Sequence, residues 1–246
     1  MFNTTKALVL REVRYKEADR ILTLLTESDG KITAKARGAL RKSSRTAAAT
    51  QQLTWSEMTL FGNRGKWTVN EAVVVEGFDG LRTDLEALAL GAYFSECLEA
   101  LAVEDQPDPA LLQLGLNALY ALSHRLCPPE QIKAAFELRL MSLSGYEPDL
   151  TACAHCGKEP ERPLLSLQDG RVSCAGCPHG GETLPLCPDS LAAMRYILSA
   201  PAKRLFSFSI KGEAADRLSW AAEAYLLRQT ERRFGTLEYY KQVRAK

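Results

Sequence analysis

The chain contains no long run of apolar residues. No segment approaches the ~18 consecutive apolar residues that a membrane-spanning helix needs. At the N-terminus, Arg11, Glu12 and Arg14 interrupt the apolar stretch that a signal peptide would require. The sequence therefore predicts no association with a membrane. Its 246 residues are 46% hydrophobic and 25% charged, a composition typical of a folded soluble protein.

Recognisable catalytic motifs are also missing. The sequence has no G-x-S-x-G, no P-loop and no G-x-G-x-x-G, and it contains only three histidines. The carboxylates of residues 81–150 occur singly or on the outer faces of expected helices. Because no acid–base pair can be identified, we predict that the protein is not an enzyme.

Seven cysteines are present, and an odd number does not fit a fully paired disulfide framework. This count indicates a reducing cytoplasm, where closely spaced cysteines more often hold metal. Four of them form a C-x2-C…C-x2-C pattern with seventeen residues between the pairs: Cys153, Cys156, Cys174 and Cys177.

This quartet matches the all-sulfur tetrahedral shell of a structural zinc ion. We expect one Zn²⁺ and no catalytic metal, because four thiolates leave no open coordination position. A metalloenzyme would need fewer than four protein ligands. His155, His179 and Cys187 are close in sequence, but the quartet already fills the shell.

Charge is unevenly distributed along the chain. Residues 1–45 carry eleven Lys and Arg against five Asp and Glu, residues 81–150 carry four against eleven, and residues 203–246 carry ten against five. Basic ends around an acidic middle suggest a polyanionic partner or a self-complementary assembly. The simpler alternative is that solvated faces happen to differ in charge.

Residues 4–78 have the pattern of β structure, with five short apolar or alternating runs separated by turns. Ser28-Asp29-Gly30 is one turn, and residues 62–65 are expected to form a hairpin loop. Five strands without a long helix predict a small barrel of OB type, although an SH3-like barrel has a similar pattern. We assign residues 1–80 to this N-terminal domain.

From Leu81 onward the apolar residues recur at three- and four-residue steps, which indicates helices. Asp84 is the expected cap of the first helix. Further helices are expected near 110–126, from 129, at 189–199 and at 213–234, the last two completing the chain. The fold class is therefore α+β: an OB-fold barrel, then an all-α domain at 81–246 with a four-cysteine zinc finger inserted at about 150–187.

A basic segment follows the third expected strand. Six cations fall within fifteen residues, without an intervening acidic residue: Lys31, Lys35, Arg37, Arg41, Lys42 and Arg45. Residues 39–52 are rich in Ser, Thr and Ala, and we expect a flexible loop that follows a phosphate backbone without reading bases. The alternative is a solubilising loop.

Aromatic residues add a weaker signal. Tyr15, Trp55, Phe61 and Trp67 lie in or beside the expected strands, where rings can stack on bases or, more commonly, fill the core. We favour Trp67 as a nucleic-acid contact, together with its basic neighbours Arg64 and Lys66.

The C-terminal helix combines apolar and basic positions. A groove of this type could receive a short acidic-hydrophobic peptide, and a bundle helix with a solvated basic side is the alternative. The candidate residues for such a peptide are Arg217, Tyr225, Arg228 and Arg232.

Taken together, these residues resemble the RecO family of bacterial recombination mediators. The most specific stretch is FELRLMSLSGYEPDLTACAHCG, at residues 136–157, and KALVL at 6–10, YKEAD at 15–19 and ARGA at 36–39 are also similar. The chain departs from the family at Gln51-Gln52-Leu53, where many members have proline, and at 235–237. The resemblance covers nearly the whole chain.

The resemblance implies an OB-fold, a helical domain and a zinc finger. It also implies binding of single- and double-stranded DNA, strand annealing, and displacement of single-strand-binding protein (SSB) so that RecA can load, with RecR as a helper. The protein would then be cytoplasmic and associated with the nucleoid. The competing interpretation is a zinc-containing protein-interaction adaptor with little direct DNA binding.

Overall fold

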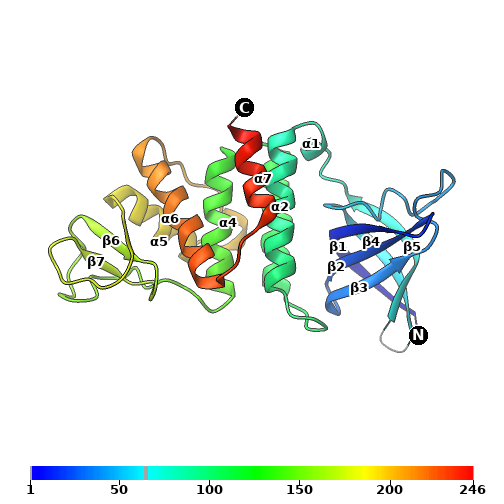
Figure 1. The fold of residues 1–246 in the computed structure, drawn as a ribbon, viewed down its shortest axis with the longest axis horizontal. Helices are drawn as coiled ribbons and strands as arrows, with labels where there is room; N and C mark the ends of the chain where they lie inside the picture. The colour runs from blue at the N-terminus through cyan, green and yellow to red at the C-terminus, as the bar shows by residue number, and fades with distance from the viewer. Residues whose placement is uncertain (1, 64–65, 246) are drawn as a thin grey trace. The chain divides into compact units, whose positions relative to one another are not determined.

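The N-terminal residues form five strands in a computed structural model that describes residues 2–63 and 66–245. The strands close into a barrel with the order β1-β2-β3-β5-β4 (Figure 1). All neighbouring strands are antiparallel except β3 and β5, which are parallel over three residue pairs. The predicted five-stranded barrel of OB type is thus confirmed. The strands are β1 (Phe2–Tyr15), β2 (Asp19–Thr26), β3 (Gly30–Ala36), β4 (Trp55–Asn63) and β5 (Lys66–Glu76).

Alternation along the strands builds the barrel core. In β3, Ile32, Ala34 and Ala36 are buried, while the residues between them are at least partly exposed. Gly30 starts this strand with φ of 66°, and a Cβ there would lie 2.1 Å from the carbonyl oxygen of Gln106. Only glycine fits this turn without moving the chain.

Four helices belong to the same compact unit as the barrel, which comprises Met1–His124 and Phe234–Lys246. Asp84 caps α2 as predicted, accepting hydrogen bonds from the backbone N–H groups of Glu86 and Ala87 at 3.0 and 3.1 Å. The four are α1 (Asp79–Arg82), α2 (Leu85–Leu101), α3 (Pro109–Ser123) and α7 (Gly235–Arg244).

The single helix expected at 213–234 is wrong at its C-terminal end. Helix α6 (Glu213–Thr230) stops before Glu231, which has a left-handed φ of 51°, and the chain then turns into α7. Glu96 on α2 accepts hydrogen bonds from the backbone N–H and the hydroxyl of Thr236, which satisfies the first turn of α7. The chain therefore has a further helix that packs against α2.

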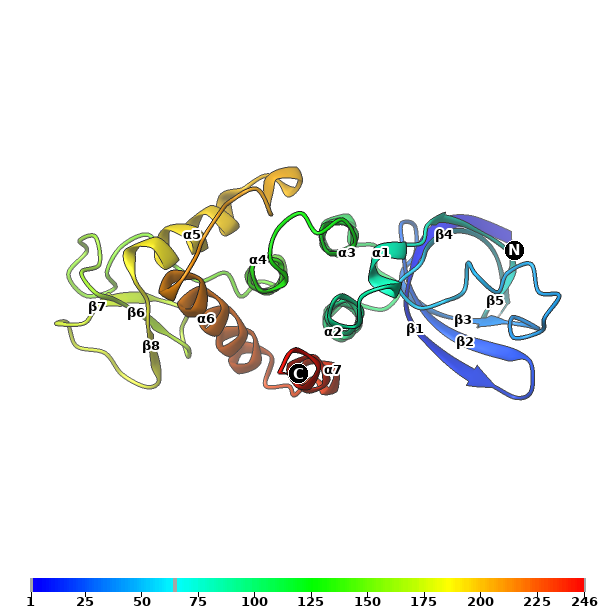
Figure 2. The same ribbon diagram turned by 90° about the horizontal axis from the view of Figure 1, so that it is seen from above.

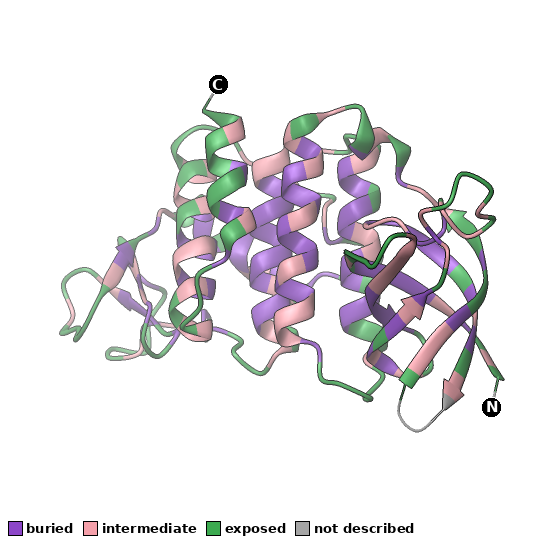
Figure 3. Ribbon diagram, turned by 45° about the vertical axis from the view of Figure 1, so that its right-hand side comes forward, coloured by how far each residue is buried: buried purple, intermediate pink, exposed green. Residues whose placement is uncertain are grey.

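The second compact unit comprises Arg125–Arg233. Its helices α4 (Pro129–Leu143), α5 (Pro188–Ser199) and α6 pack against one another, and a short turn of 3-10 helix follows α5 (Figure 2). The segment between α4 and α5 carries a three-stranded sheet with the order β7-β6-β8. Its strands are β6 (Pro163–Ser166), β7 (Val172–Cys174) and β8 (Thr183–Pro185). Figure 3 shows that the loops of this segment are mainly exposed.

An ion cluster is buried between α4 and α6. Lys133 places its Nζ 2.9 Å from Glu137 Oε1 and 2.8 Å from Glu223 Oε2. Burial lowers the pKa of Lys133, but the two carboxylates outweigh burial and hold the pKa above its usual value. Lys133 therefore remains charged inside the helical unit.

The division at residue 80 that we expect from the sequence follows the change from strands to helices. The two compact units are divided differently, after His124 and before Phe234, so the assignment of residues 1–80 as a domain stays a prediction. Within residues 2–63 and 66–245, no helix combines the length and the hydropathy required to traverse a bilayer.

Candidate metal centre and nucleic-acid interface

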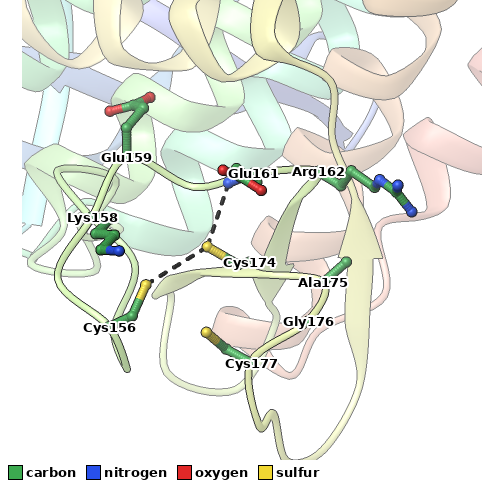
Figure 4. A pocket seen from close by; sticks show the side chains of 9 residues that line it. All are labelled: Cys156, Lys158, Glu159, Glu161, Arg162, Cys174, Ala175, Gly176 and Cys177. Atoms are coloured by element: carbon green, nitrogen blue, oxygen red, sulfur yellow. Dashed lines mark hydrogen bonds between the residues drawn. The ribbon is translucent and has the colours of Figure 1, made fainter.

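The four predicted cysteine ligands meet at one point of the second unit. Their sulfur atoms all lie within 4.8 Å of one another, and the Sγ atoms of Cys156 and Cys174 are 3.8 Å apart. Figure 4 shows the side chains of Cys156, Cys174 and Cys177 around a shared space. Four thiolates at ~2.3 Å from a zinc ion would be separated by ~3.8 Å, so this donor set fits a tetrahedral metal.

Each cysteine pair is held by a tight turn. The backbone N–H of Gly157 donates to Cys153 O at 2.9 Å, and that of Cys177 donates to Cys174 O at 3.0 Å. Gly157 has φ of 70°, a conformation that suits glycine. Strand β7 places Cys174 beside the first turn, where the backbone N–H of Cys174 donates to Cys153 Sγ at 3.3 Å.

Backbone donors make one of these thiols acidic. The N–H groups of Cys156, His155 and Cys174 donate to Cys153 and lower its pKa to about 5. Metal ligands must be thiolates, and Cys153 is the thiol whose charged form is favoured here. The hydrogen bond with Cys153 raises the pKa of Cys177 to about 12, and the pKa of Cys174 is also raised.

The three possible substitute ligands lie outside this cluster. His179 Nδ1 is 2.9 Å from Cys177 O, and Cys187 precedes α5, where its backbone N–H donates to Ser190 Oγ. Neither they nor His155 belong to the sulfur cluster found among the described residues.

The three-stranded sheet of the cysteine segment is fixed to α6. Gln229 Nε2 donates to Leu167 O at 2.8 Å. Gly170 lies so close to Tyr225 that a Cβ at Gly170 would come within 2.4 Å of the tyrosine hydroxyl. The metal segment is therefore docked on the helical unit and is not a separate body.

The predicted DNA contacts of the barrel divide into groups. Arg37, Arg41, Lys42 and Arg45 are exposed, and within the described residues none of them has an ion pair with a carboxylate. All four lie at the end of β3 or on the loop that follows it. We refer to residues 37–45 as the exposed basic loop. Among the candidates of the first unit that were selected from the sequence, its four cations are the largest group without an ion pair in the described residues.

The loop is better anchored than its composition predicts. Ala39 and Ala49 are buried in the barrel core, and the backbone N–H of Leu40 donates to Ala18 O at 2.9 Å. Arg20 donates to Ala47 O and to the Thr50 hydroxyl at 2.9 and 3.0 Å. The small apolar residues that suggest a flexible loop in the sequence instead pin this segment to the barrel.

Lys31 lies at the opposite end of β3. Lys35 is four positions farther along the strand than Lys31, a distance of about 13 Å. Lys31 Nζ donates to the carbonyl oxygen of Glu99 on α2 at 2.9 Å. Lys31 thus already has an intramolecular partner and is not next to the exposed basic loop.

The other aromatic and basic candidates are dispersed. Lys66 is exposed at the start of β5, whereas Trp67 is half-buried and packs against the barrel core and over Gly62. Arg64 lies outside the described residues. The fold thus gives Trp67 a packing role, whatever else it contacts.

The candidates on α6 do not form one groove. Tyr225 is 2% exposed, and its hydroxyl donates to Tyr146 O; burial, together with the charge of Asp169, raises the pKa of Tyr225 to about 12. Arg217 donates to Leu186 O at 2.7 Å and pairs with Glu213. Arg228 is exposed and lies about 16 Å farther along the helix than Arg217. Arg232 lies beyond the end of α6.

Strand pairing reveals a cluster that the sequence did not select. Tyr15 on β1 is 43% exposed, and Lys35 Nζ lies 4.9 Å from its ring centroid. The same ammonium group is 2.9 Å from Asp19 Oδ2, while Asp19 Oδ1 accepts from the backbone N–H of Gly38 at 2.8 Å. Lys35 and Gly38 hold the pKa of Asp19 below its usual value. The sequence signal was only an aromatic residue beside a basic segment.

Comparison with known proteins assigns both parts of the chain. The family model described as Recombination protein O N terminal matches residues 1–78, and that described as Recombination protein O C terminal matches residues 82–238. The protein called DNA repair protein RecO in Acetivibrio thermocellus is 35% identical over 239 residues, covering 96% of this chain and 95% of that protein. Its namesake in Symbiobacterium thermophilum is 35% identical over 247 residues, covering 97% and 96%.

Proposed function

We propose, because this chain belongs to the RecO family of DNA repair proteins, that it is a recombination mediator that acts by binding DNA. In this role it binds single- and double-stranded DNA, anneals complementary strands, and helps RecA to load on SSB-coated DNA together with RecR. It works in the cytoplasm at the nucleoid. Its chemistry is non-covalent, so it is not an enzyme.

The observation that carries this proposal is the exposed basic loop. Its four cations have no carboxylate partner within the described residues, so they are available to phosphates. Cations that neutralise phosphates release condensed counterions, and this release supplies affinity without base specificity. Because the loop is anchored at both ends, these charges are presented together on the barrel.

Annealing follows from the same property. A protein that holds two strands through their backbones leaves their bases free and raises the local concentration of each strand for the other. No group needs to break or form a covalent bond for this activity.

We assign the metal to zinc. Cys153, Cys156, Cys174 and Cys177 would hold it, and their four thiolates would leave it with a structural role, cross-linking the turns around β7. The ion would supply folding free energy to a segment with few buried residues.

Protein partners are proposed for the helical unit. The exposed cations Arg228 and Arg232 would attract the acidic C-terminal tail of SSB, with electrostatics as the main contribution because Tyr225 is buried. RecR is proposed as the second partner, without a surface assigned to it.

The test is a salt titration of DNA binding. Arg37→Ala with Arg41→Ala should weaken binding of a single-stranded oligonucleotide. The negative slope of log K against log salt should become shallower by about 0.7 for each phosphate that the loop no longer neutralises. Lys203→Ala with Lys211→Ala removes the same charge from exposed positions of the second unit and is the matched control.

An unchanged slope in the loop variant would remove this loop from the mechanism. A wild-type protein that binds an acidic SSB-like peptide but no oligonucleotide, even at low salt, would instead favour the protein-interaction adaptor.

A further inference from the structure

The outer surface of the barrel beside the exposed basic loop has a regular composition. Strand pairing places Val13, Ile21, Lys35 and Thr68 in one row across four strands. Residues directly opposite each other on paired strands share a face, and side chains two positions along a strand share it as well. Tyr15, two positions beyond Val13 on β1, therefore belongs to this face, and Arg37 directly follows the end of β3.

The ring of Tyr15 is partly exposed on this face and is contacted there by two ammonium groups. It is 43% exposed, and no other aromatic ring packs against it among residues 2–63 and 66–245. Single exposed aromatic side chains are common on protein surfaces, so the case for Tyr15 depends on the cations placed at its ring. The barrel thus leaves apolar ring surface available next to its cations.

Two ammonium groups lie over this ring. Lys35 Nζ lies 4.9 Å and Lys16 Nζ 5.6 Å from the ring centroid. Asp19 fixes Lys35 in place through its 2.9 Å ion pair, whereas Lys16 is exposed at the tip of the hairpin and has no ion pair in the described part of the chain. One cation is therefore pre-positioned and the other is able to follow a ligand.

A ligand that fits this arrangement must offer a flat π-surface between two anionic groups. A nucleotide of a single strand has this chemistry, with a base between successive phosphates. A base pair within a duplex does not, because its faces are already stacked on its neighbours.

We propose that Tyr15 is a stacking platform for an unpaired base, with Lys16 and Lys35 contacting the phosphates on either side. This proposal rests on the proposed function, since it requires DNA to lie on the barrel. It adds selectivity: the exposed basic loop attracts any nucleic-acid backbone, and Tyr15 favours the single-stranded form. Asp19 acts as a positioning residue by holding Lys35 beside the ring and Gly38 at the start of the loop.

The experiment compares two oligonucleotides of equal length and charge. One carries bases throughout, and the other has abasic sites over the central nucleotides. Wild-type protein should bind the base-containing strand more tightly. Tyr15→Leu should lower affinity for that strand by about five-fold or more, the effect of losing one base–aromatic stack. Its affinity for the abasic strand should stay unchanged.

Two variants control the measurement. Tyr15→Phe keeps the ring and should retain the preference for bases. Tyr146→Leu removes a tyrosine of similar exposure, 44%, from the second unit and should also retain it. Thermal unfolding of each variant shows that the fold is intact, and the salt slope should match that of the wild type because no cation is removed.

The proposal is overturned if Tyr15→Leu keeps the wild-type ratio of affinities for the two strands. In that case the proposed function survives, since the wild type still binds DNA. If the wild type binds neither strand at low salt, DNA binding by the barrel fails, and the stacking platform fails with it.

Discussion

Lys133 and Glu137 lie one turn apart on α4 with 1% and 0% of their side chains exposed. Moving two charges out of water costs several kcal/mol for each ion, and their attraction repays this cost only if the geometry is good. Here Glu223 from α6 adds a second carboxylate at 2.8 Å. The three side chains therefore join the two helices through charges. Replacing one of them alone is expected to destabilise the fold, because its partners lose a counter-charge.

Replacing Lys133 alone should be severe. Lys133→Met keeps the apolar stem and removes the charge, so Glu137 stays buried without its closest cation. We expect a loss of about 3–5 kcal/mol in the free energy of unfolding, measured by urea denaturation. The matched control is Lys133→Met with Glu137→Leu, which removes the two fully buried charges, leaves the partly exposed Glu223, and should recover most of the loss. Equal stability of the two variants would contradict this explanation.

The pH dependence has a defined sign. The folded pKa of Lys133 is above its reference value of 10.5, so its contribution to stability is complete below that pH and is lost only as the pH rises through the folded pKa. The destabilisation by Lys133→Met should be smaller at about pH 6 than at about pH 9, because a buried carboxyl that has lost Lys133 takes up a proton more readily at the lower pH.

The spatial neighbours of some residues can be predicted from the sequence, and those of others cannot. The four cysteines were predicted correctly as a cluster because two short turns bring ligands together locally, and only the meeting of the turns needed the fold. Tyr15 and Lys35 could not be paired in advance, since their contact depends on strand register across β1, β2 and β3. Lys31 and Lys35 are neighbours in sequence, yet one contacts α2 and the other Tyr15.

At the scale of elements, the three-stranded sheet of the cysteine segment is smaller than the five-stranded barrel. Its strands have three or four residues each, and its apolar core includes Leu165, Val172 and Leu184. Sheets of this size are marginal by themselves in water. The docking of this sheet on α6 and a metal ion in the sulfur cluster are the two stabilising features that the structure indicates.

Metal removal should therefore unfold this element selectively. Elemental analysis of the purified protein should give about one zinc per chain. Cys174→Ser should abolish this zinc and increase hydrogen exchange in β6–β8, because a structural zinc contributes on the order of 10 kcal/mol to folding. Cys187→Ser is the control, since that thiol lies outside the cluster. A well-protected sheet with four free thiols and no metal would refute the assignment.

At two places in the chain, local sequence patterns do not predict the observed structure. The boundary between α6 and α7 has no proline, and the chain turns at Glu231 in a conformation that non-glycine residues seldom adopt. Its position depends on packing of α7 against α2. The loop after β3 has a composition typical of a mobile segment, but Ala39 and Ala49 are small enough to enter the barrel core. In both cases tertiary contacts override local preference.

At the scale of the whole molecule, the first unit is assembled from both ends of the chain. Helix α7 contributes Leu237 and Tyr240, each 1% exposed, and Phe234 just before it packs edge-on against Tyr93 of α2 at a centroid distance of 5.8 Å. The barrel-containing unit is thus incomplete until residues after 233 join it.

Truncation tests this dependence. A chain ending at Arg233 lacks three buried side chains worth about 1.5–3 kcal/mol each. We expect faster hydrogen exchange throughout α2, with little change in α4 and α6, which belong to the other unit. A chain ending at Arg244 keeps α7 and should exchange as the full-length protein does. Equal protection of α2 in both truncated chains would show that α7 adds no stability.

The late arrival of α7 also affects synthesis on the ribosome. At ~5–20 residues per second, roughly 7–27 s pass between translation of the last residue of α2 and translation of the first residue of α7. During that interval the nascent chain exposes the apolar side of α2, including Tyr93, which α7 and Phe234 later cover. Chaperone engagement of the growing polypeptide should be concentrated in this window, and it should end when the final helix emerges from the exit tunnel.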